Sequence, residues 1–201
     1  MIADRLAPFG TTIFSEMTRL AGEHKAINLA QGFPDFEGPP ELVEAAVRAL
    51  RGGDNQYARS MGHSSLVHAI AEHQRRHFAL EWDPMEEVVV FSGATEGIAS
   101  SLIGLLNPGD EVIVFEPFYD SYLACLAMAG AVPKFATLRL PDFRVDFDEL
   151  TSLISSKTKA LLLNSPHNPT GKVFEGEELD CLAAFCQEHD LIVIADEVYE
   201  H

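Results

Sequence analysis

Hydrophobic residues in the second half of the chain occur in short continuous runs, separated by segments with helical spacing. The segments 87–91, 111–115, 132–137, 159–163 and 191–195 are predicted strands, and most of them are continuously apolar, which is typical of buried strands. Helical spacing of the apolar positions predicts helices over 94–106, 119–129, 147–155 and 176–189. Apolar strands that alternate with helices indicate a mainly parallel sheet covered on both faces. We therefore predict an α/β fold, a three-layer α/β/α sandwich.

The first part of the chain has a different pattern. Residues 1–37 show little periodicity, so we assign them to an N-terminal arm that belongs in part to a small domain. Residues 38–201 are assigned to one large domain. Within it, apolar residues predict a helix over 41–51, which ends at Gly52-Gly53, and a second helix over 62–80.

One loop is expected to be stiff. It reads Asn164-Ser165-Pro166-His167-Asn168-Pro169-Thr170-Gly171-Lys172 and connects the predicted strand 159–163 to the predicted helix 176–189. Each proline holds φ near about −65° and biases the preceding residue to extended geometry, so the two carboxamides of the loop are held in place. The strand 191–195 ends in Asp196-Glu197-Val198-Tyr199. This layout predicts a ligand crevice at the carboxyl ends of parallel strands.

A second motif, Ser92-Gly93-Ala94-Thr95-Glu96-Gly97, joins a predicted strand to the start of a predicted helix. Small residues let the backbone approach a ligand, and the free N–H groups and dipole of a helix N-terminus favour an anion such as a phosphate. Taken alone, such a motif is more often a plain glycine turn.

Composition excludes several classes of partner. The chain of 201 residues has a formal net charge of −17, which argues against nucleic acid or an anionic membrane as a partner. No apolar run approaches membrane length, and the start lacks the apolar segment of a signal peptide. The three cysteines have no zinc-like spacing, so we expect reduced side chains and a cytoplasmic protein.

Neither a metal site nor a nucleotide hydrolase site is predicted. The predicted helix 62–80 carries His68, His73 and His77, but a zinc protease motif needs Glu directly after the first His of a pair, and Gln74 follows His73. Asp196-Glu197 after an apolar strand is also found in P-loop proteins. Their phosphate loop needs a Gly five residues before the Gly of Gly-Lys and a Ser or Thr directly after the Lys. Here Pro166 and Val173 occupy these two positions around Gly171-Lys172.

The stiff loop and the end of the last predicted strand together resemble a known family. The loop from Asn164 to Gly171, followed after a helix by Ala-Asp-Glu-Val-Tyr at 195–199, is similar to the class I, fold-type-I pyridoxal-phosphate aminotransferases. The resemblance is strongest to the kynurenine, glutamine and methionine transaminases, also called the cysteine-conjugate β-lyase group. It extends from Asn28-Leu29-Ala30-Gln31-Gly32-Phe33-Pro34 to the last residue, and it implies that residues 38–201 are part of a domain that binds pyridoxal 5′-phosphate.

The resemblance implies roles for the residues that surround the cofactor. Gly93, Ala94 and Thr95 would cradle its phosphate, and Phe118 would stack on its pyridine ring. Asp196 would accept the N–H of the protonated ring nitrogen, because a carboxylate at the end of an apolar strand is costly unless it is paired. A protonated ring is a strong electron sink.

Other positions match the remaining ligand contacts of the family. Asn168 and Tyr199 would hydrogen-bond the phenolic oxygen of the cofactor, so that Asp196 and Tyr199 are the catalytic residues that the resemblance implies. Gly32 and Asn164, together with Asn168, would line the substrate side. Tyr57 matches the tyrosine that reaches the cofactor phosphate of the neighbouring subunit, which implies a homodimer with shared active sites.

The activity implied is transfer of an amino group from an L-amino acid to a 2-oxo acid. Two alternatives stay open: elimination from cysteine conjugates, and a non-catalytic module derived from the same fold. The family's imine-forming lysine lies beyond the Asp-x-x-Tyr motif, and none of the five lysines of this sequence, Lys25, Lys134, Lys157, Lys159 and Lys172, matches it. The sequence thus resembles the amino-terminal half of such an enzyme, and we expect it to be inactive alone. Lys172 is expected at the surface. His167 differs from the residue that many members of the family carry between the Pro and the second Asn of the loop.

Overall fold

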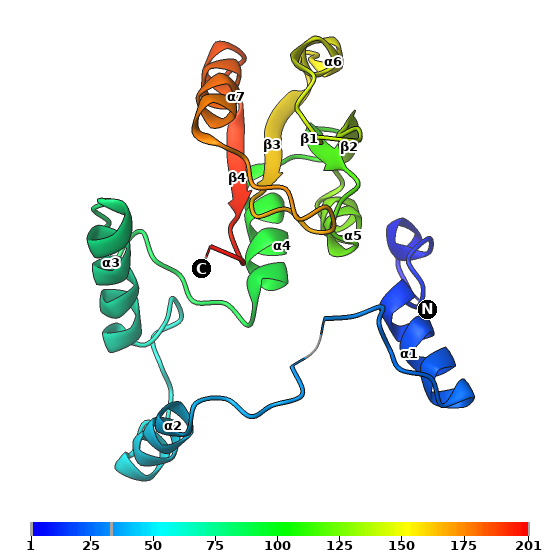
Figure 1. Cartoon of the computed structure of the whole chain (residues 1–201). Coiled ribbons are helices and arrows are strands. Elements are labelled where there is room, and N and C mark those ends of the chain that lie inside the picture. Colours follow the sequence, from blue (N-terminus) through cyan, green and yellow to red (C-terminus); the bar gives the residue numbers. More distant parts are fainter. Residues whose placement is uncertain (1, 33, 201) are drawn as a thin grey trace. The chain divides into compact units, whose positions relative to one another are not determined.

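The computed structural model describes residues 2–32 and 34–200 (Figure 1). Phe33, within the first motif of the resemblance, lies outside this range. The chain divides into two compact units: Met1–Gly10 with Ser92–His201, and Thr11–Phe91. These boundaries differ from the expected division at residues 37 and 38, which stays a prediction about the domains of a whole enzyme.

The larger unit is built on a parallel sheet of four strands, β1 (Glu111–Glu116), β2 (Val132–Thr137), β3 (Thr158–Asn164) and β4 (Ile192–Asp196). They lie in the order β2-β1-β3-β4. In the register of β3 and β4, Asn164 is opposite Asp196. The parallel arrangement therefore brings two polar residues, far apart in sequence, to the same edge of the sheet.

Helices cover both faces of this sheet. Val112 and Val114 of β1 and the apolar residues of β3 at 160 and 162 pack against α4 (Ala94–Leu105) and α5 (Ser121–Ala129). Their neighbours at 113, 115, 161 and 163 pack against α6 (Phe147–Leu153) and α7 (Gly176–Glu188). Because successive side chains of a strand point to opposite faces, continuously apolar strands need two helical layers. The predicted α/β/α sandwich is confirmed, with element ends within about two residues of those expected.

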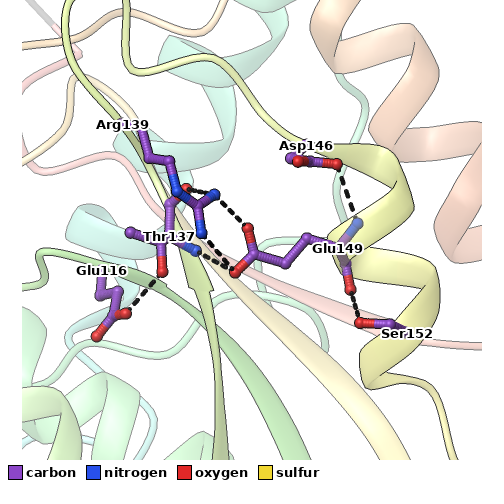
Figure 2. Close-up of polar contacts among 6 residues, drawn as sticks. All are labelled: Glu116, Thr137, Arg139, Asp146, Glu149 and Ser152. Atoms are coloured by element: carbon purple, nitrogen blue, oxygen red, sulfur yellow. Dashed lines mark hydrogen bonds and ion pairs between the residues drawn. The ribbon is translucent and has the colours of Figure 1, made fainter.

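A polar network ties the carboxyl ends of β1 and β2 to α6 (Figure 2). The Thr137 hydroxyl donates to Glu116 at 2.7 Å, and the Thr137 N–H donates to Glu149 at 3.3 Å. Arg139 donates to Glu149 at 2.6 Å, and this bond lowers the pKa of the Glu149 carboxyl. Asp146 caps α6 by accepting from the Glu149 N–H at 3.0 Å. The network fixes the loop that follows β2.

The smaller unit contains α1 (Ile13–His24), α2 (Pro40–Gly52) and α3 (Ser64–Phe78). The last two match the predicted helices 41–51 and 62–80. The first was not expected, although Phe14, Met17, Leu20 and Ala21 have helical spacing and are partly buried, and Thr12 caps the helix at 3.2 Å. The arm assigned to residues 1–37 thus contains a regular helix.

The predicted strand 87–91 is wrong: the segment forms no ladder in the described chain. Val88 is buried against Val67 and Ala71 of α3, and the Val90 N–H donates to the Met61 carbonyl at 3.0 Å. A strand is stable only when a neighbour pairs with its backbone groups. Helix packing satisfies the apolar side chains of this segment without a sheet.

Candidate functional site

A cavity of about 230 Å³ lies at the carboxyl ends of β3 and β4, beside the N-terminus of α4. Its polar and aromatic lining includes Gly93, Thr95, Tyr119, Tyr122, Asn164, Asn168, Asp196 and Tyr199. Seven of the residues proposed from the sequence, Gly93, Ala94, Thr95, Asn164, Asn168, Asp196 and Tyr199, line this one cavity. Segments separated by about a hundred residues therefore meet as the sequence pattern predicted.

Asp196 is the buried acid of this cavity, with 8% of its surface exposed. Its Oδ2 accepts the Tyr122 hydroxyl at 2.6 Å, and its Oδ1 accepts the Val198 N–H at 3.2 Å. Both carboxylate oxygens are thus hydrogen-bonded, which reduces the cost of burial. A carboxylate offers about four acceptor positions, so Asp196 can still accept a hydrogen bond from a ligand.

Asn164 links the stiff loop to the end of β4. Its Nδ2 donates to the Asp196 carbonyl at 2.9 Å, and its Oδ1 accepts the Asn168 N–H at 2.7 Å. The Ser165 N–H also donates to the Asp196 carbonyl, at 3.1 Å. Asn164 has only 2% of its surface exposed. Both the nitrogen and the oxygen of its carboxamide are used in hydrogen bonds that hold the loop. Its predicted contact with substrate stays a prediction.

The rest of the loop is fixed by its own polar groups. His167 is buried, and its Nδ1 lies 2.8 Å from the Thr170 hydroxyl. The Gly171 N–H donates to the His167 carbonyl at 2.8 Å, and Gly171 has a φ of +73°, which glycine adopts without strain. Burial, and secondly the charge of Lys172, lower the pKa of His167.

Lys172 was expected at the surface, and this expectation is wrong. Only 9% of its side chain is exposed, and its Nζ lies 2.8 Å from Glu178 Oε2 on α7. The ammonium also lies 4.7 Å from the centre of the Phe174 ring, a cation–π distance. The pair therefore joins the loop to the helix that follows it.

The N-terminus of α4 forms another wall of the cavity. Gly93 precedes the helix with a φ of +93°, and no side chain caps the first turn. Glu96 instead accepts the Ser92 N–H at 2.5 Å. The first N–H groups of a helix have no partner within it, so those of this turn are suited to hold an anion.

Two tyrosines for which no role was predicted, Tyr119 and Tyr122, also line the cavity. Their rings meet edge to face at 5.7 Å. Burial is the largest cause that raises the pKa of both phenols, and the bond to Asp196 raises that of Tyr122 further. Tyrosines at a strand end and in the first turn of the next helix are a signal that could have pointed to them.

Phe118 is partly buried and packs against the core that α4, α5 and the sheet share. It packs against Phe135 with ring centres 5.6 Å apart and planes 16° apart, and it is absent from the lining of the cavity among the described residues. Tyr119 supplies an aromatic wall instead. Stacking of Phe118 on a ligand ring stays a prediction.

Gly32 and Tyr57 belong to the smaller unit, where both are exposed. Tyr57 is fully exposed to solvent. An exposed phenol is consistent with a contact to another subunit, and the roles of both residues stay predictions.

Larger hollows exist, of about 420 and 530 Å³, but they have a different character. They lie along residues 137–148 and the start of α7 and are lined by charged side chains of both signs. No group of residues suited to a metal ion occurs within 2–32 and 34–200. In the same part of the chain, no helix is both long and apolar enough to cross a membrane.

The fold and the cavity define an α/β domain with a cavity where its parallel strands end, lined by the N-terminus of α4 and by a buried carboxylate. The chain belongs to the family of class I and II aminotransferases, whose model matches residues 24–201. Members of this family depend on pyridoxal 5′-phosphate.

Named relatives support this assignment. The chain is 48% identical to the probable N-succinyldiaminopimelate aminotransferase DapC of Mycobacterium tuberculosis, with 100% of this chain and 51% of the relative covered. The solved structure of N-succinyldiaminopimelate aminotransferase from that organism superposes with a TM-score of 0.95 at 47% identity, covering 100% of this chain and 53% of the other. The methionine aminotransferase of Escherichia coli is 42% identical, covering 98% of this chain and 51% of the relative. The mouse kynurenine–oxoglutarate transaminase 3 is 42% identical, covering 98% of this chain and 46% of the relative. The chain thus spans about half the length of the curated relatives it matches.

Proposed function

We propose that the protein, at its natural length, is a pyridoxal-phosphate-dependent aminotransferase that moves an amino group from an L-amino acid to a 2-oxo acid. The observation that carries this proposal is that a buried carboxylate, Asp196, and the N-terminus of α4 line the same cavity. The cofactor has matching groups, a ring nitrogen and a phosphate. The residues present therefore fit it.

In this proposal each residue has one task. The N–H groups at Gly93, Ala94 and Thr95 bind the phosphate. Asp196 accepts the N–H of the ring nitrogen and holds its proton in place. When bound, the cofactor supplies an electron sink for the negative charge that develops on the α-carbon of the substrate.

Asn168 and Tyr199 line the same cavity. Their side chains can donate hydrogen bonds to the phenolic oxygen of the cofactor, which orients the ring and stabilises negative charge on that oxygen. Asn164 holds the Asn168 backbone through the 2.7 Å bond described above, so the loop presents Asn168 in a fixed position. Orientation and electrostatics are thus the contribution of this part of the chain.

The imine-forming lysine is a further requirement of the activity. None of the five lysines lines the cavity in the described chain, and Lys172 is engaged with Glu178. The lysine would therefore come from residues outside this sequence, and the 201 residues alone are expected to be inactive. The exposed Tyr57 is proposed to reach the phosphate of a neighbouring subunit in a homodimer, and the enzyme is proposed to act in the cytoplasm.

The substrate is proposed to belong to the group named by the relatives, which are aminotransferases of N-succinyldiaminopimelate, methionine and kynurenine. Our preference is for a kynurenine, methionine or glutamine type of amino acid. A panel of these amino acids, with N-succinyldiaminopimelate included, would rank them by the rate of 2-oxo acid formation.

The proposed function is tested on the protein at its natural length with added pyridoxal phosphate. We expect a yellow protein whose visible absorption band changes when an L-amino acid is added. Asp196→Asn keeps the shape of the side chain and removes its charge, and it should lower turnover by at least about a hundredfold. Glu197→Gln, on an exposed neighbour, is the matched control. A protein that stays colourless with saturating cofactor would overturn the proposal.

A further inference from the structure

Tyr122 has no role in the function proposed above, although it is among the most buried side chains of the chain. It lies on α5, and only 1% of its surface is exposed. Its hydroxyl ends 2.6 Å from Asp196 Oδ2, across 74 residues of sequence. The rest of the ring packs in the core that α4, α5 and the sheet share.

The direction of this hydrogen bond follows from the chemistry of the two groups. An ionised carboxylate can only accept, so the phenol donates. Burial and the neighbouring acid both raise the pKa of Tyr122, and the phenol therefore keeps its proton at physiological pH. A charge-assisted O–H···O hydrogen bond of this length is among the stronger hydrogen bonds in proteins.

The bond also fixes the orientation of the acid. Tyr122 reaches Oδ2 from α5, while the Val198 N–H reaches Oδ1 from the segment that follows β4 at 3.2 Å. Two donors on different oxygens, from different elements, define the plane of the carboxylate. A rotation about the last side-chain bond of Asp196 would break both contacts.

A purely structural role would not need the hydroxyl. A phenylalanine would fill the same apolar site, whereas a buried hydroxyl costs free energy unless it has a partner. The partner here is Asp196, a buried acid that lines the cavity. The polar end of Tyr122 therefore acts on the cavity, while its ring stabilises the core.

We propose that Tyr122 is a positioning residue, whose hydroxyl holds the Asp196 carboxylate in the orientation that accepts a hydrogen bond from the ring nitrogen of the cofactor. This inference rests on the proposed function, because it concerns the same cavity. It adds a residue that acts through Asp196 and does not itself touch the reacting atoms.

The test compares Tyr122→Phe with Leu126→Val in the protein at its natural length, loaded with pyridoxal phosphate that carries ¹⁵N in the ring. Leu126 lies one turn further along α5, is fully buried and has no part in the cavity lining. It therefore reports the effect of core destabilisation alone. The two readouts are the ¹⁵N chemical shift of the ring nitrogen and the rate at which the cofactor dissociates.

Tyr122→Phe should move the ¹⁵N shift toward that of the unprotonated ring and speed cofactor dissociation by about tenfold, the range of one hydrogen bond to a charged group. Leu126→Val should leave both readouts at the parent values. Tyr122→p-aminophenylalanine, which keeps an N–H donor at the same place, should recover most of the parent shift. If the phenylalanine variant does not fold, the comparison of the p-aminophenylalanine variant with the parent decides the question: a parent-like ¹⁵N shift supports the positioning role, and a shift toward the unprotonated ring contradicts it.

The outcomes separate this inference from the proposed function. A parent protein that takes up no pyridoxal phosphate overturns the proposed function and, with it, this inference. A parent that binds the cofactor, with a Tyr122→Phe variant of unchanged ¹⁵N shift and dissociation rate, overturns only the positioning role. Equal changes in Tyr122→Phe and Leu126→Val would assign Tyr122 to the core alone and would also overturn it.

Discussion

Lys172 Nζ lies 2.8 Å from Glu178 Oε2, and the two side chains are only 9% and 17% exposed. The second oxygen of Glu178, Oε1, accepts the Val145 N–H at 2.9 Å. Glu178 therefore joins the loop after β3 and the segment before α6 to the helix α7. The loop that carries Asn168 is thereby tied to α7 at its end, outside the residues that line the cavity.

Removing one partner of this pair should destabilise the protein strongly. Lys172→Met leaves the Glu178 carboxylate largely buried with one partner fewer, and we expect a loss of about 3 kcal/mol in the free energy of unfolding. Urea unfolding followed by circular dichroism measures this loss. The double variant Lys172→Met with Glu178→Gln should be less destabilised than the sum of the single variants. Additive losses would show that the two groups do not interact.

His167 is expected to titrate below the ordinary histidine pKa of about 6.5. Burial disfavours its charged form, and the positive Lys172 acts in the same direction. An NMR titration of the His167 ring should show a midpoint below that value in the parent. The midpoint should rise in Lys172→Met, provided that variant is folded at the pH used.

The lowered pKa of His167 also predicts the sign of a pH effect on stability. Below about pH 6.5 the unfolded chain binds a proton that the folded chain does not, so stability falls as the pH decreases toward the lower, folded-state value. Above that pH the contribution is fully present. His167→Gln should weaken this part of the acid dependence, and an unchanged profile would contradict the assignment.

Most of the sheet could be predicted because its strands are apolar on both faces. Residues 132–137 form β2 with the bounds expected, and the alternation of strands and helices fixed the three layers. The strand expected at 87–91 failed for a physical reason. Periodicity reports that a segment is buried, and it does not report whether a neighbouring strand is present to accept its hydrogen bonds.

The site was predictable only where residues follow the ends of strands. Asn164 and Asp196 meet because they end adjacent parallel strands, and this follows from the topology. The bond between Tyr122 and Asp196 joins a helix to a strand across 74 residues, and no spacing in the sequence encodes it. Likewise, the sequence did not show that Phe118 faces Phe135 while Tyr119 lines the cavity.

A substitution of Gly93 is expected to destabilise the protein because of the backbone conformation at this position, and not because of its neighbours. An added Cβ would meet open space, but φ is +93°. Gly93→Ala should therefore cost about 1–2 kcal/mol and weaken phosphate binding as the turn shifts. Gly176→Ala is the matched control, since Gly176 also faces open space, opens α7 and has no positive φ. That change should be neutral or stabilise by up to about 1 kcal/mol. Thermal unfolding with and without inorganic phosphate would measure both effects.

Asn164 is expected to be essential to the loop before any role in chemistry. Its carboxamide satisfies the Asp196 carbonyl and the Asn168 N–H in a site with 2% exposure. Asn164→Leu has a similar volume and leaves the Asn168 N–H without its acceptor and the Asp196 carbonyl with only the Ser165 N–H. The expected loss is about 2–4 kcal/mol, since each unsatisfied buried group costs about 1–3 kcal/mol.

The matched control for Asn164→Leu is Gln187→Ala, on the exposed side of α7, which should stay within about 0.5 kcal/mol of the parent. Hydrogen exchange distinguishes a local from a global effect. In Asn164→Leu the amides of Asn168 and Ser165 should exchange faster than in the parent, while those in the centre of β1 change only with global stability. Parent-like protection at Asn168 would mean that the loop is held by its prolines and the Lys172–Glu178 pair, without help from the carboxamide.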